Sequence, residues 1–206
     1  IRAGAILGKR VASALSEELK EFIEGGRPIL GICNGFQVLV ESGLLPGFDG
    51  FSGYSQAALA INDSARYECR WVHLKHENRD KCIFTRKIQM GQKLFMPVAH
   101  VEGKFVFRKG EEEQCLQKLK ENDQLVFRYC DEEGRYAEGK YPTNPNGAFH
   151  DIAGICDPTG KVFGLMPHPE RAHLGIQLPN WATMEKIPKY ADGMLIFESL
   201  VEYLRH

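Results

Sequence analysis

Apolar and polar residues alternate along the chain with two periods, which predict helices interleaved with strands. In residues 9–24 the apolar side chains recur at helical spacing, and the glycine pair at 25–26 predicts the end of this helix. Further helices are predicted at residues 34–42, 111–121 and 192–204. Short apolar or alternating runs predict strands at residues 28–32, 69–74, 94–98, 105–107, 124–129, 152–155 and 162–166.

The connections between these elements indicate how the strands are arranged. Residues 100–104 are expected to form a turn between two strands, and the sequence Asp-Pro-Thr-Gly at 157–160 is typical of a hairpin turn. Helices near both ends of a chain of mixed strands predict a doubly wound α/β sheet with an antiparallel excursion in its middle.

A cysteine lies between two glycines where the predicted strand at residues 28–32 gives way to a helix. The sequence Gly-Ile-Cys-Asn-Gly at 31–35 has the form of a nucleophile elbow, whose small residues permit a strained turn. Free N–H groups at the start of a helix stabilise a thiolate. Cys33 is therefore a candidate nucleophile, and the backbone N–H of Asn34 is a candidate donor to an oxyanion.

A histidine and a glutamate follow another apolar run far downstream. His168 and Glu170 come directly after the predicted strand at 162–166, and Pro167 and Pro169 restrict the backbone on both sides of the histidine. Open α/β sheets place their sites at the carboxyl ends of strands, where His168 would serve as base and Glu170 would orient it. Either motif alone is more often structural, but their coincidence favours a cysteine hydrolase or acyl-transfer site.

A second pair with the same spacing competes with this assignment. His100 and Glu102 also lie two residues apart after an apolar run, but no proline flanks them. We rank them second and expect the segment 100–103 to line the rim of the pocket or a contact with a partner.

Composition narrows the class of protein. The chain has 206 residues, of which 43% are hydrophobic and 26% charged, with 26 basic and 27 acidic side chains. This balance argues against an electrostatic nucleic-acid or membrane binder, and no apolar run approaches the length of a membrane span. Six cysteines without regular spacing indicate reduced thiols, one reactive and five structural, in a cytoplasmic protein. No zinc-ligand spacing is present, so no metal is expected.

The elbow and the histidine motif are similar to those of a known family. Residues 31–37 and 43–47 resemble the nucleophile segment of class I (triad) glutamine amidotransferases, most closely those that serve phosphoribosylformylglycinamidine synthase in purine biosynthesis. Other matching segments are residues 2–6, 97–103, 144–147, 151–154 and 164–172. The resemblance covers the chain from end to end and implies a flavodoxin-like, mostly parallel sheet with helices on both faces.

The resemblance also implies the site and its partners. Cys33, His168 and Glu170 correspond to the catalytic triad, and Gln37 corresponds to a contact with the substrate glutamine. Ammonia would pass to an ATP- and Mg-dependent synthetase, the formylglycinamide ribonucleotide amidotransferase large subunit, with a small bridging subunit as a further partner. This chain has no phosphate-binding glycine-lysine motif, so no cofactor is expected to bind here.

Several positions depart from the family pattern. Val101 stands where glycine is usual, Ala148 stands where serine is common, and the segment 172–190 is longer than in compact members. This segment is expected either to lie over the pocket or at a subunit contact, or to be a surface insertion. The single domain 1–206 is expected to lack an N-terminal strand, helix and strand and a glycine-rich turn, which would supply the second oxyanion donor.

Two other functions remain open from the sequence. A stand-alone cysteine hydrolase of γ-glutamyl bonds would use the same triad without a partner. A degenerate subunit that only binds and regulates a synthase would retain the fold without efficient catalysis.

Overall fold

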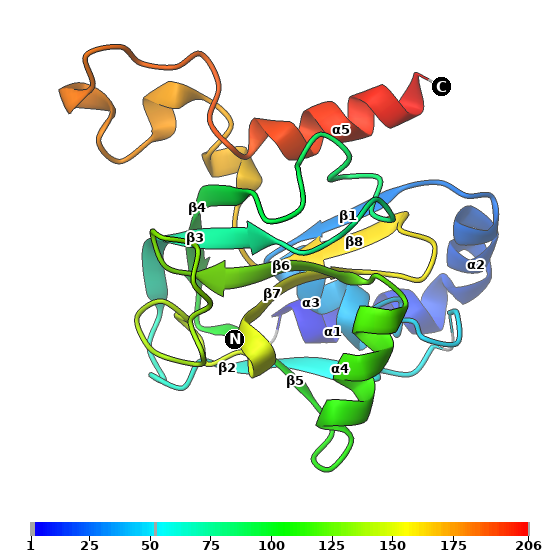
Figure 1. The fold of residues 1–206 in the computed structure, drawn as a ribbon. Helices are drawn as coiled ribbons and strands as arrows, with labels where there is room; N and C mark the ends of the chain where they lie inside the picture. Colours follow the sequence, from blue (N-terminus) through cyan, green and yellow to red (C-terminus); the bar gives the residue numbers. More distant parts are fainter. Residues whose placement is uncertain (1–2, 52, 206) are drawn as a thin grey trace.

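The computed structural model describes residues 3–51 and 53–205, which fold around a six-stranded sheet in the order β1-β8-β7-β6-β3-β4 (Figure 1). A separate two-stranded sheet pairs β2 with β5. The strands are β1 (Ile29–Ile32), β2 (Ala57–Ile61), β3 (Glu68–His76), β4 (Lys93–His100), β5 (Glu102–Phe107), β6 (Leu125–Cys130), β7 (Ile152–Cys156) and β8 (Val162–Leu165).

Helices flank the sheet, with α5 on one side of it and α1 and α3 on the other (Figure 1). The α-helices are α1 (Ala3–Ala14), α2 (Ser16–Glu24), α3 (Asn34–Glu41), α4 (Glu112–Glu121) and α5 (Met194–Leu204). The described residues also form the short 3₁₀ helices η1 (Phe149–Asp151), η2 (Pro169–Arg171), η3 (Gly175–Gln177) and η4 (Trp181–Thr183). The α/β class and its layered architecture are therefore as predicted.

The six-stranded sheet is mixed. Only the pairing of β1 with β8 is parallel among its described strands, and the other four pairings are antiparallel. The excess of parallel pairings that the resemblance implies is thus absent from the residues described. For β7 and β8 the physical reason is the connection, because the short turn at residues 157–161 can join only antiparallel strands.

Three local predictions were wrong. The predicted helix at 9–24 begins earlier, at Ala3, and is interrupted at Leu15, whose backbone leaves the helical region. The predicted turn at 100–104 is reduced to Val101, because β4 and β5 belong to different sheets and the chain passes directly between them. Strand β2 was missed, since its sequence Ala-Ala-Leu-Ala-Ile carries little β-branched character.

The nucleophile segment is held by close packing of α3 on the sheet. A Cβ added to Gly31 would lie 2.5 Å from Leu39 and 2.8 Å from the Gly35 backbone, so β1 and α3 approach each other where only glycine fits. On β8, Gly164 similarly makes room for the buried ring of Phe36. A Cβ on Gly35 itself would meet nothing within 4 Å, so of the two flanking glycines only Gly31 is sterically required.

Helix α1 packs against α3 with the same polarity. Gly4 lies against Gln37 and Asn34 near the start of α3, and Gly8 lies against Val38 and Glu41 further along. Both helices therefore begin at the same end of the molecule. Two glycines one turn apart allow this close approach.

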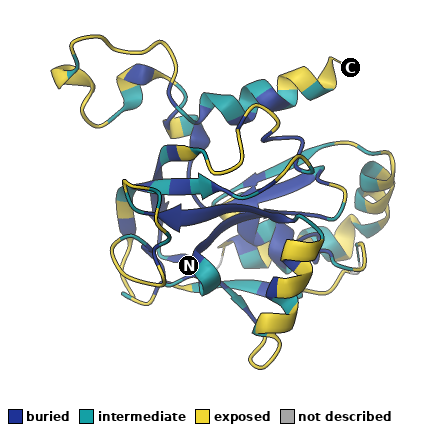
Figure 2. Cartoon of the chain, in the orientation of Figure 1, coloured by how far each residue is buried: buried dark blue, intermediate teal, exposed yellow. Residues whose placement is uncertain are grey.

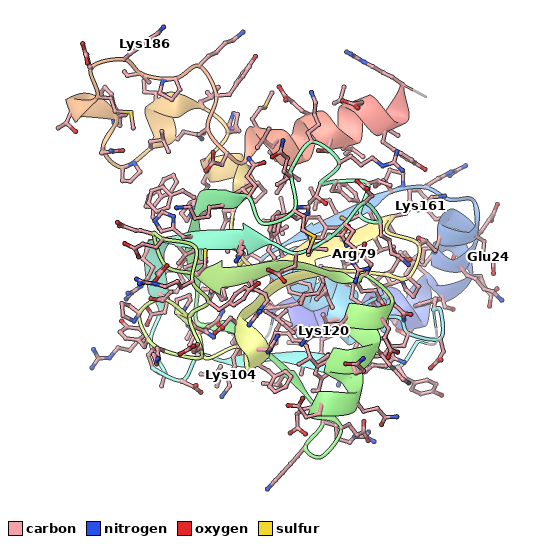
Figure 3. All side chains as sticks on the ribbon, in the orientation of Figure 1. Glu24, Arg79, Lys104, Lys120, Lys161 and Lys186 are labelled. Carbon is pink, nitrogen blue, oxygen red and sulfur yellow. The ribbon has the colours of Figure 1, made fainter. Side chains whose placement is uncertain are left out.

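The segment 172–190, hereafter the arm, projects from the body of the fold. It leaves the sheet after β8 and returns at the start of α5, and it is drawn in orange in Figure 1. Figure 2 shows that the strands of the sheet are largely buried whereas much of the arm is exposed. Lys186 marks its outer part in Figure 3. The arm thus extends away from the sheet and does not fold back over it.

Candidate active site

Cys33 occupies a strained turn between β1 and α3. Its backbone has φ 51° and ψ −102°, a combination that residues other than glycine rarely adopt. Such conformations cost about 1–3 kcal/mol and persist only where surrounding contacts enforce them. Here the Cys33 N–H donates to Leu165 O at 2.8 Å, and the Cys33 carbonyl accepts from Gln37 N–H at 3.2 Å. The strained turn places the half-buried Cys33 at the apex of the elbow, as the sequence predicts.

The thiol lies where two helices begin. Cys33 caps the N-terminus of α3, and the packing of Gly4 on Asn34 brings the first turn of α1 beside it. The first N–H groups of a helix have no intrahelical partner and carry partial positive charge. The Asn34 N–H belongs to this set, so the local field favours an anion beside Cys33.

His168 and Glu170 meet directly. The His168 Nδ1 atom donates to Glu170 Oε1 at 2.5 Å, and the His168 backbone N–H donates to Pro97 O on β4 at 2.8 Å. Pro169 opens the 3₁₀ helix η2, and this tight turn carries the Glu170 carboxylate back toward the imidazole. Because Glu170 occupies Nδ1, the other ring nitrogen, Nε2, is left for the thiol. Nε2 is buried and has no conventional hydrogen-bond partner within the described protein.

The surroundings of His168 favour its charged form. Burial disfavours the imidazolium, but the neighbouring Cys33 thiol and the Glu170 carboxylate outweigh it and raise the pKa of His168 to about 9. Burial also acts on Glu170, yet the hydrogen bond from His168 lowers the pKa of this carboxyl below its usual range. Arg171 assists, with Nε 3.6 Å from Glu170 Oε1. The carboxylate thus stays ionised and stabilises an imidazolium.

Neighbouring parallel strands bring the nucleophile and the base together. Ile32 of β1 pairs with Leu165 of β8, and Cys33 and His168 follow these residues at the carboxyl ends of the two strands. The Cys33 thiol also faces β4, where Sγ lies 3.8 Å from Ala99 O. The three side chains predicted as a triad therefore converge at one edge of the sheet.

His100 has a different environment from His168. It is 4% exposed, and its Nδ1 lies 3.2 Å from Asn62 Oδ1, while the Asn62 amide nitrogen donates to His100 O at 2.9 Å. Burial and the nearby charge of His168 lower the pKa of His100 to about 4. Glu102 is also buried. Neither of these two side chains offers an exposed surface, whereas Val101 between them is half-buried, and a contact of the segment 100–103 with the pocket rim or a partner stays a prediction.

Gln37 is close to Cys33 but is used within the fold. The side chain is 8% exposed, its Nε2 donates to Glu102 O at 2.6 Å, and its Oε1 lies against Gly4. Its amide therefore ties α3 to β5 and α1, and its contact with a glutamine substrate remains a prediction. Asn34, in contrast, is exposed at the start of α3.

The motif at residues 144–147 forms a buried network beside the site. Asn146 Nδ2 donates to Gly103 O at 2.8 Å and contacts the Tyr129 hydroxyl at 3.1 Å. Ala148, where the family commonly has serine, donates its backbone N–H to Asn146 Oδ1 at 3.0 Å. The backbone makes this contact, so the substitution at 148 preserves it.

The sequence patterns did not identify the residues that hold His100 and Glu170 in place. Asn62 holds His100 from the loop after β2, and Gln177 and His173 in the arm hydrogen bond to the carbonyl of Glu170. Each acts across a long sequence separation or through a backbone atom. Only the spacing of polar residues just after Glu170 could have drawn attention to the arm.

The described residues also bear on metal binding, membrane insertion and cysteine pairing. Among residues 3–51 and 53–205, no group of three or more His, Cys, Asp or Glu side chains is arranged to hold a metal ion. No helix in the same ranges has the length and apolar character to cross a membrane. The six cysteines are free thiols. Cys82, Cys130 and Cys156 are buried, whereas Cys69 is exposed and so is not a core residue.

Comparison with known proteins gives matches over nearly the whole chain. Residues 1–204 match the model of the CobB/CobQ-like glutamine amidotransferase domain. The chain is 54% identical over 207 residues to phosphoribosylformylglycinamidine synthase subunit PurQ of Archaeoglobus fulgidus, covering 99% of this chain and 73% of that protein. It is 46% identical to the protein of the same name from Methanococcus maripaludis, covering 98% of this chain and 74% of the relative.

A solved structure extends the agreement to the fold. One chain in the structure of PurLQS from Thermotoga maritima has a TM-score of 0.65 and 33% identity, covering 99% of this chain and 73% of the other. Both the family match and the identities extend over nearly the whole chain. The chain therefore belongs to the family of CobB/CobQ-like glutamine amidotransferases.

Proposed function

We propose that this chain is the glutaminase component of phosphoribosylformylglycinamidine synthase and hydrolyses glutamine with Cys33, His168 and Glu170. The observation that carries the proposal is the 2.5 Å contact between His168 and Glu170 beside a cysteine held at φ 51°. A nucleophile, a base and a group that orients the base are the components of a triad. The names of the relatives favour an ammonia donor over a stand-alone γ-glutamyl hydrolase.

The reaction has two halves. The Cys33 thiolate attacks the side-chain amide carbon of glutamine, and the oxyanion that forms accepts a hydrogen bond from the Asn34 N–H. When the C–N bond breaks, His168 gives its proton to the departing nitrogen, so ammonia leaves and a glutamyl thioester remains. His168 then removes a proton from water, the resulting hydroxide attacks the thioester, and glutamate leaves as the thiolate is restored.

The charges of the site suit this order of proton transfers. A pKa of about 9 keeps His168 protonated near neutral pH, so an imidazolium is ready to protonate the leaving nitrogen. Glu170 remains ionised beside it and compensates its charge. His100, with its pKa lowered to about 4, is neutral under the same conditions and adds no competing charge.

The ammonia is proposed to pass to a synthetase partner. That partner, the formylglycinamide ribonucleotide amidotransferase large subunit, would bind ATP and Mg²⁺ and use the ammonia to form an amidine. A small bridging subunit is proposed as a third component. The similar chain from Thermotoga maritima belongs to a structure named PurLQS, which is in keeping with such an assembly.

The test uses the complex of the full chain with its synthetase. Cys33→Ser should abolish amidine synthesis from glutamine while synthesis from ammonium salts continues, since only the thiol forms the thioester. We expect a loss of at least about 10³-fold in the glutamine-dependent rate. Cys69→Ser is the matched control, because the Cys69 thiol is exposed on β3, and it should leave both rates unchanged.

Two outcomes would contradict the proposal. An equal loss of the glutamine-dependent and ammonia-dependent rates in Cys33→Ser would mean that Cys33 does not generate the ammonia. Full hydrolysis of a γ-glutamyl peptide by the isolated wild-type chain would instead support the stand-alone hydrolase.

A further inference from the structure

Glu170 lies on the 3₁₀ turn η2, which brings its carboxylate to His168. The 3₁₀ helix η2 has three residues, and the Glu170 side chain is 43% exposed. One carboxylate oxygen accepts from His168, while the other has no hydrogen-bond partner within the described protein. Contacts from outside η2 can therefore add to the placement of this residue beside the imidazole.

Side chains of the arm hydrogen bond to the backbone carbonyl of Glu170. His173 Nδ1 lies 2.8 Å from Glu170 O, and Gln177 Nε2 donates to the same oxygen at 3.2 Å. Two side chains of the arm thus converge on one atom of the proposed triad residue.

The amide of Gln177 links this carbonyl to the start of the arm. Its Oε1 accepts the backbone N–H of His173 at 3.0 Å and of Leu174 at 2.8 Å. An oxygen must accept these two N–H groups, so the amide nitrogen is left to face Glu170. One half-buried side chain of η3 therefore makes one hydrogen bond to the turn that carries Glu170 and two to the residues that join this turn to η3.

The base of the arm is itself anchored to the body. Leu174 and Tyr190 form an antiparallel bridge, and Ala191 N–H donates to His173 O at 3.0 Å. The Asp192 carboxylate then accepts the Phe95 N–H of β4 at 2.7 Å. Gln177 therefore lies in a part of the arm that is hydrogen bonded to the body of the fold, and not in a free loop.

We propose that Gln177 is a positioning residue that holds Glu170 against His168 and so couples the base of the arm to the triad. The proposal deepens the proposed function and rests on it for the roles of Glu170 and His168. The Gln177 amide hydrogen bonds to backbone atoms, so its effect passes through the Glu170 backbone. Misplacing a catalytic group by about 1 Å can cost on the order of 10²-fold in rate.

The charge state of His168 supplies a specific readout. The titratable groups that face it are the Cys33 thiol from α3, the Glu170 carboxylate from η2 and the neutral His100 at the end of β4, with Arg171 beyond Glu170. A less well placed Glu170 stabilises the imidazolium less, so His168 would lose its proton at lower pH.

The test measures alkylation of Cys33 by iodoacetate against pH, resolved by peptide mass, in the full chain. This anionic reagent reacts fastest when thiolate and imidazolium coexist, so the alkaline decline in rate reports deprotonation of His168. Gln177→Met keeps the volume of the side chain and removes its hydrogen bonds. We expect the decline to move to lower pH by about one unit, and the glutamine-dependent rate of the complex to fall roughly 10-fold with KM nearly unchanged.

Two control variants and a double variant complete the design. Thr183→Ala removes an exposed hydrogen bond elsewhere in the arm, and Gln117→Met alters an exposed glutamine on α4; neither should move the decline. In a Glu170→Gln background, Gln177→Met should add no further shift, because Gln177 acts through Glu170.

Two results would overturn the proposal. One is a Gln177→Met variant that folds normally and whose rate of Cys33 alkylation declines at the same alkaline pH as in the wild type. The other is a shift of the same size with and without Glu170→Gln, which would indicate a merely structural effect on the arm. Because alkylation needs no glutamine, these results are distinct from failure of the proposed function, which Cys33→Ser tests.

Discussion

The chain contains two His-x-Glu segments whose outcomes are opposite. His168 hydrogen bonds to Glu170 at 2.5 Å, whereas His100 faces the amide oxygen of Asn62 at 3.2 Å. Both rings are buried, which by itself lowers the pKa, yet the pKa of His168 rises to about 9 while that of His100 falls to about 4. The difference shows that equal spacing in sequence does not fix the chemistry of a histidine.

Backbone geometry explains the contrast. Pro169 begins a 3₁₀ turn that returns Glu170 to the imidazole. Val101, in the corresponding position between His100 and Glu102, joins two strands of different sheets. The proline that distinguishes the two segments in sequence is therefore the physical origin of the carboxylate contact.

The largest expected difference between the segments is in catalysis. In the complex, His168→Ala should lower glutamine-dependent synthesis by about 10³-fold or more, since proton transfer in both half-reactions depends on it. His100→Ala should lower it by less than about 10-fold, because a neutral, amide-bound imidazole moves no proton in the mechanism. Steady-state rates with glutamine and with ammonium salts measure this. Abolition of the glutamine-dependent rate by His100→Ala alone would move His100 into the catalytic set.

The two histidines should also stabilise the fold in different pH windows. The folded pKa of His168 lies above the unfolded value of about 6.5, so its contribution is complete below that pH and is lost as pH rises toward 9. The folded pKa of His100 lies below that value, so its contribution is lost as pH falls from about 6.5 toward 4. Each window spans about 2.5 pH units and so corresponds to roughly 3 kcal/mol.

Urea denaturation across pH checks these windows. The difference in the free energy of unfolding between wild type and His168→Ala should shrink on the alkaline side, and that for His100→Ala should shrink on the acid side. Parallel pH profiles for wild type and both variants would contradict the assigned environments.

A smaller effect tests how His100 is held. A Cβ on Gly103 would lie 2.5 Å from His100 Nδ1, so Gly103→Ala must displace the ring and should destabilise the fold by about 1–3 kcal/mol. Gly35→Ala is the matched control, because its Cβ would meet nothing within 4 Å, and its stability should be unchanged or slightly higher. A neutral Gly103→Ala would show that the His100 site is adaptable.

Much of the fold was predictable because strong local signals bound its elements. The glycine pair at 25–26 ends α2, and the Asp-Pro-Thr-Gly turn joins β7 to β8 as expected. Strand β2 escaped because its alanine-rich sequence has no strand pattern. The order of strands in the sheet was not predictable either, since hydrophobic periodicity does not identify the partner of a strand.

The site was predictable in its polar groups but not in their supports. Cys33, His168 and Glu170 belong to short motifs whose chemistry is legible in sequence, and the structure brings them together, although their catalytic roles stay predictions. Asn62 and Gln177 act through contacts that arise only on folding, and nothing in their neighbours marks them. Gln37 is the converse case: it was identified from a motif, but its side chain hydrogen bonds within the fold.

The parallel pairing of β1 with β8 has a consequence for folding. It is the contact that joins the elbow to the histidine, and it closes a loop of more than about 120 residues, a slow and entropically costly step. The β7–β8 hairpin can form locally, but the thiol and imidazole meet only after β1 docks. Rapid alkylation of Cys33 during refolding would therefore time the completion of the central sheet, so that the reactive thiol serves as a built-in reporter of its assembly.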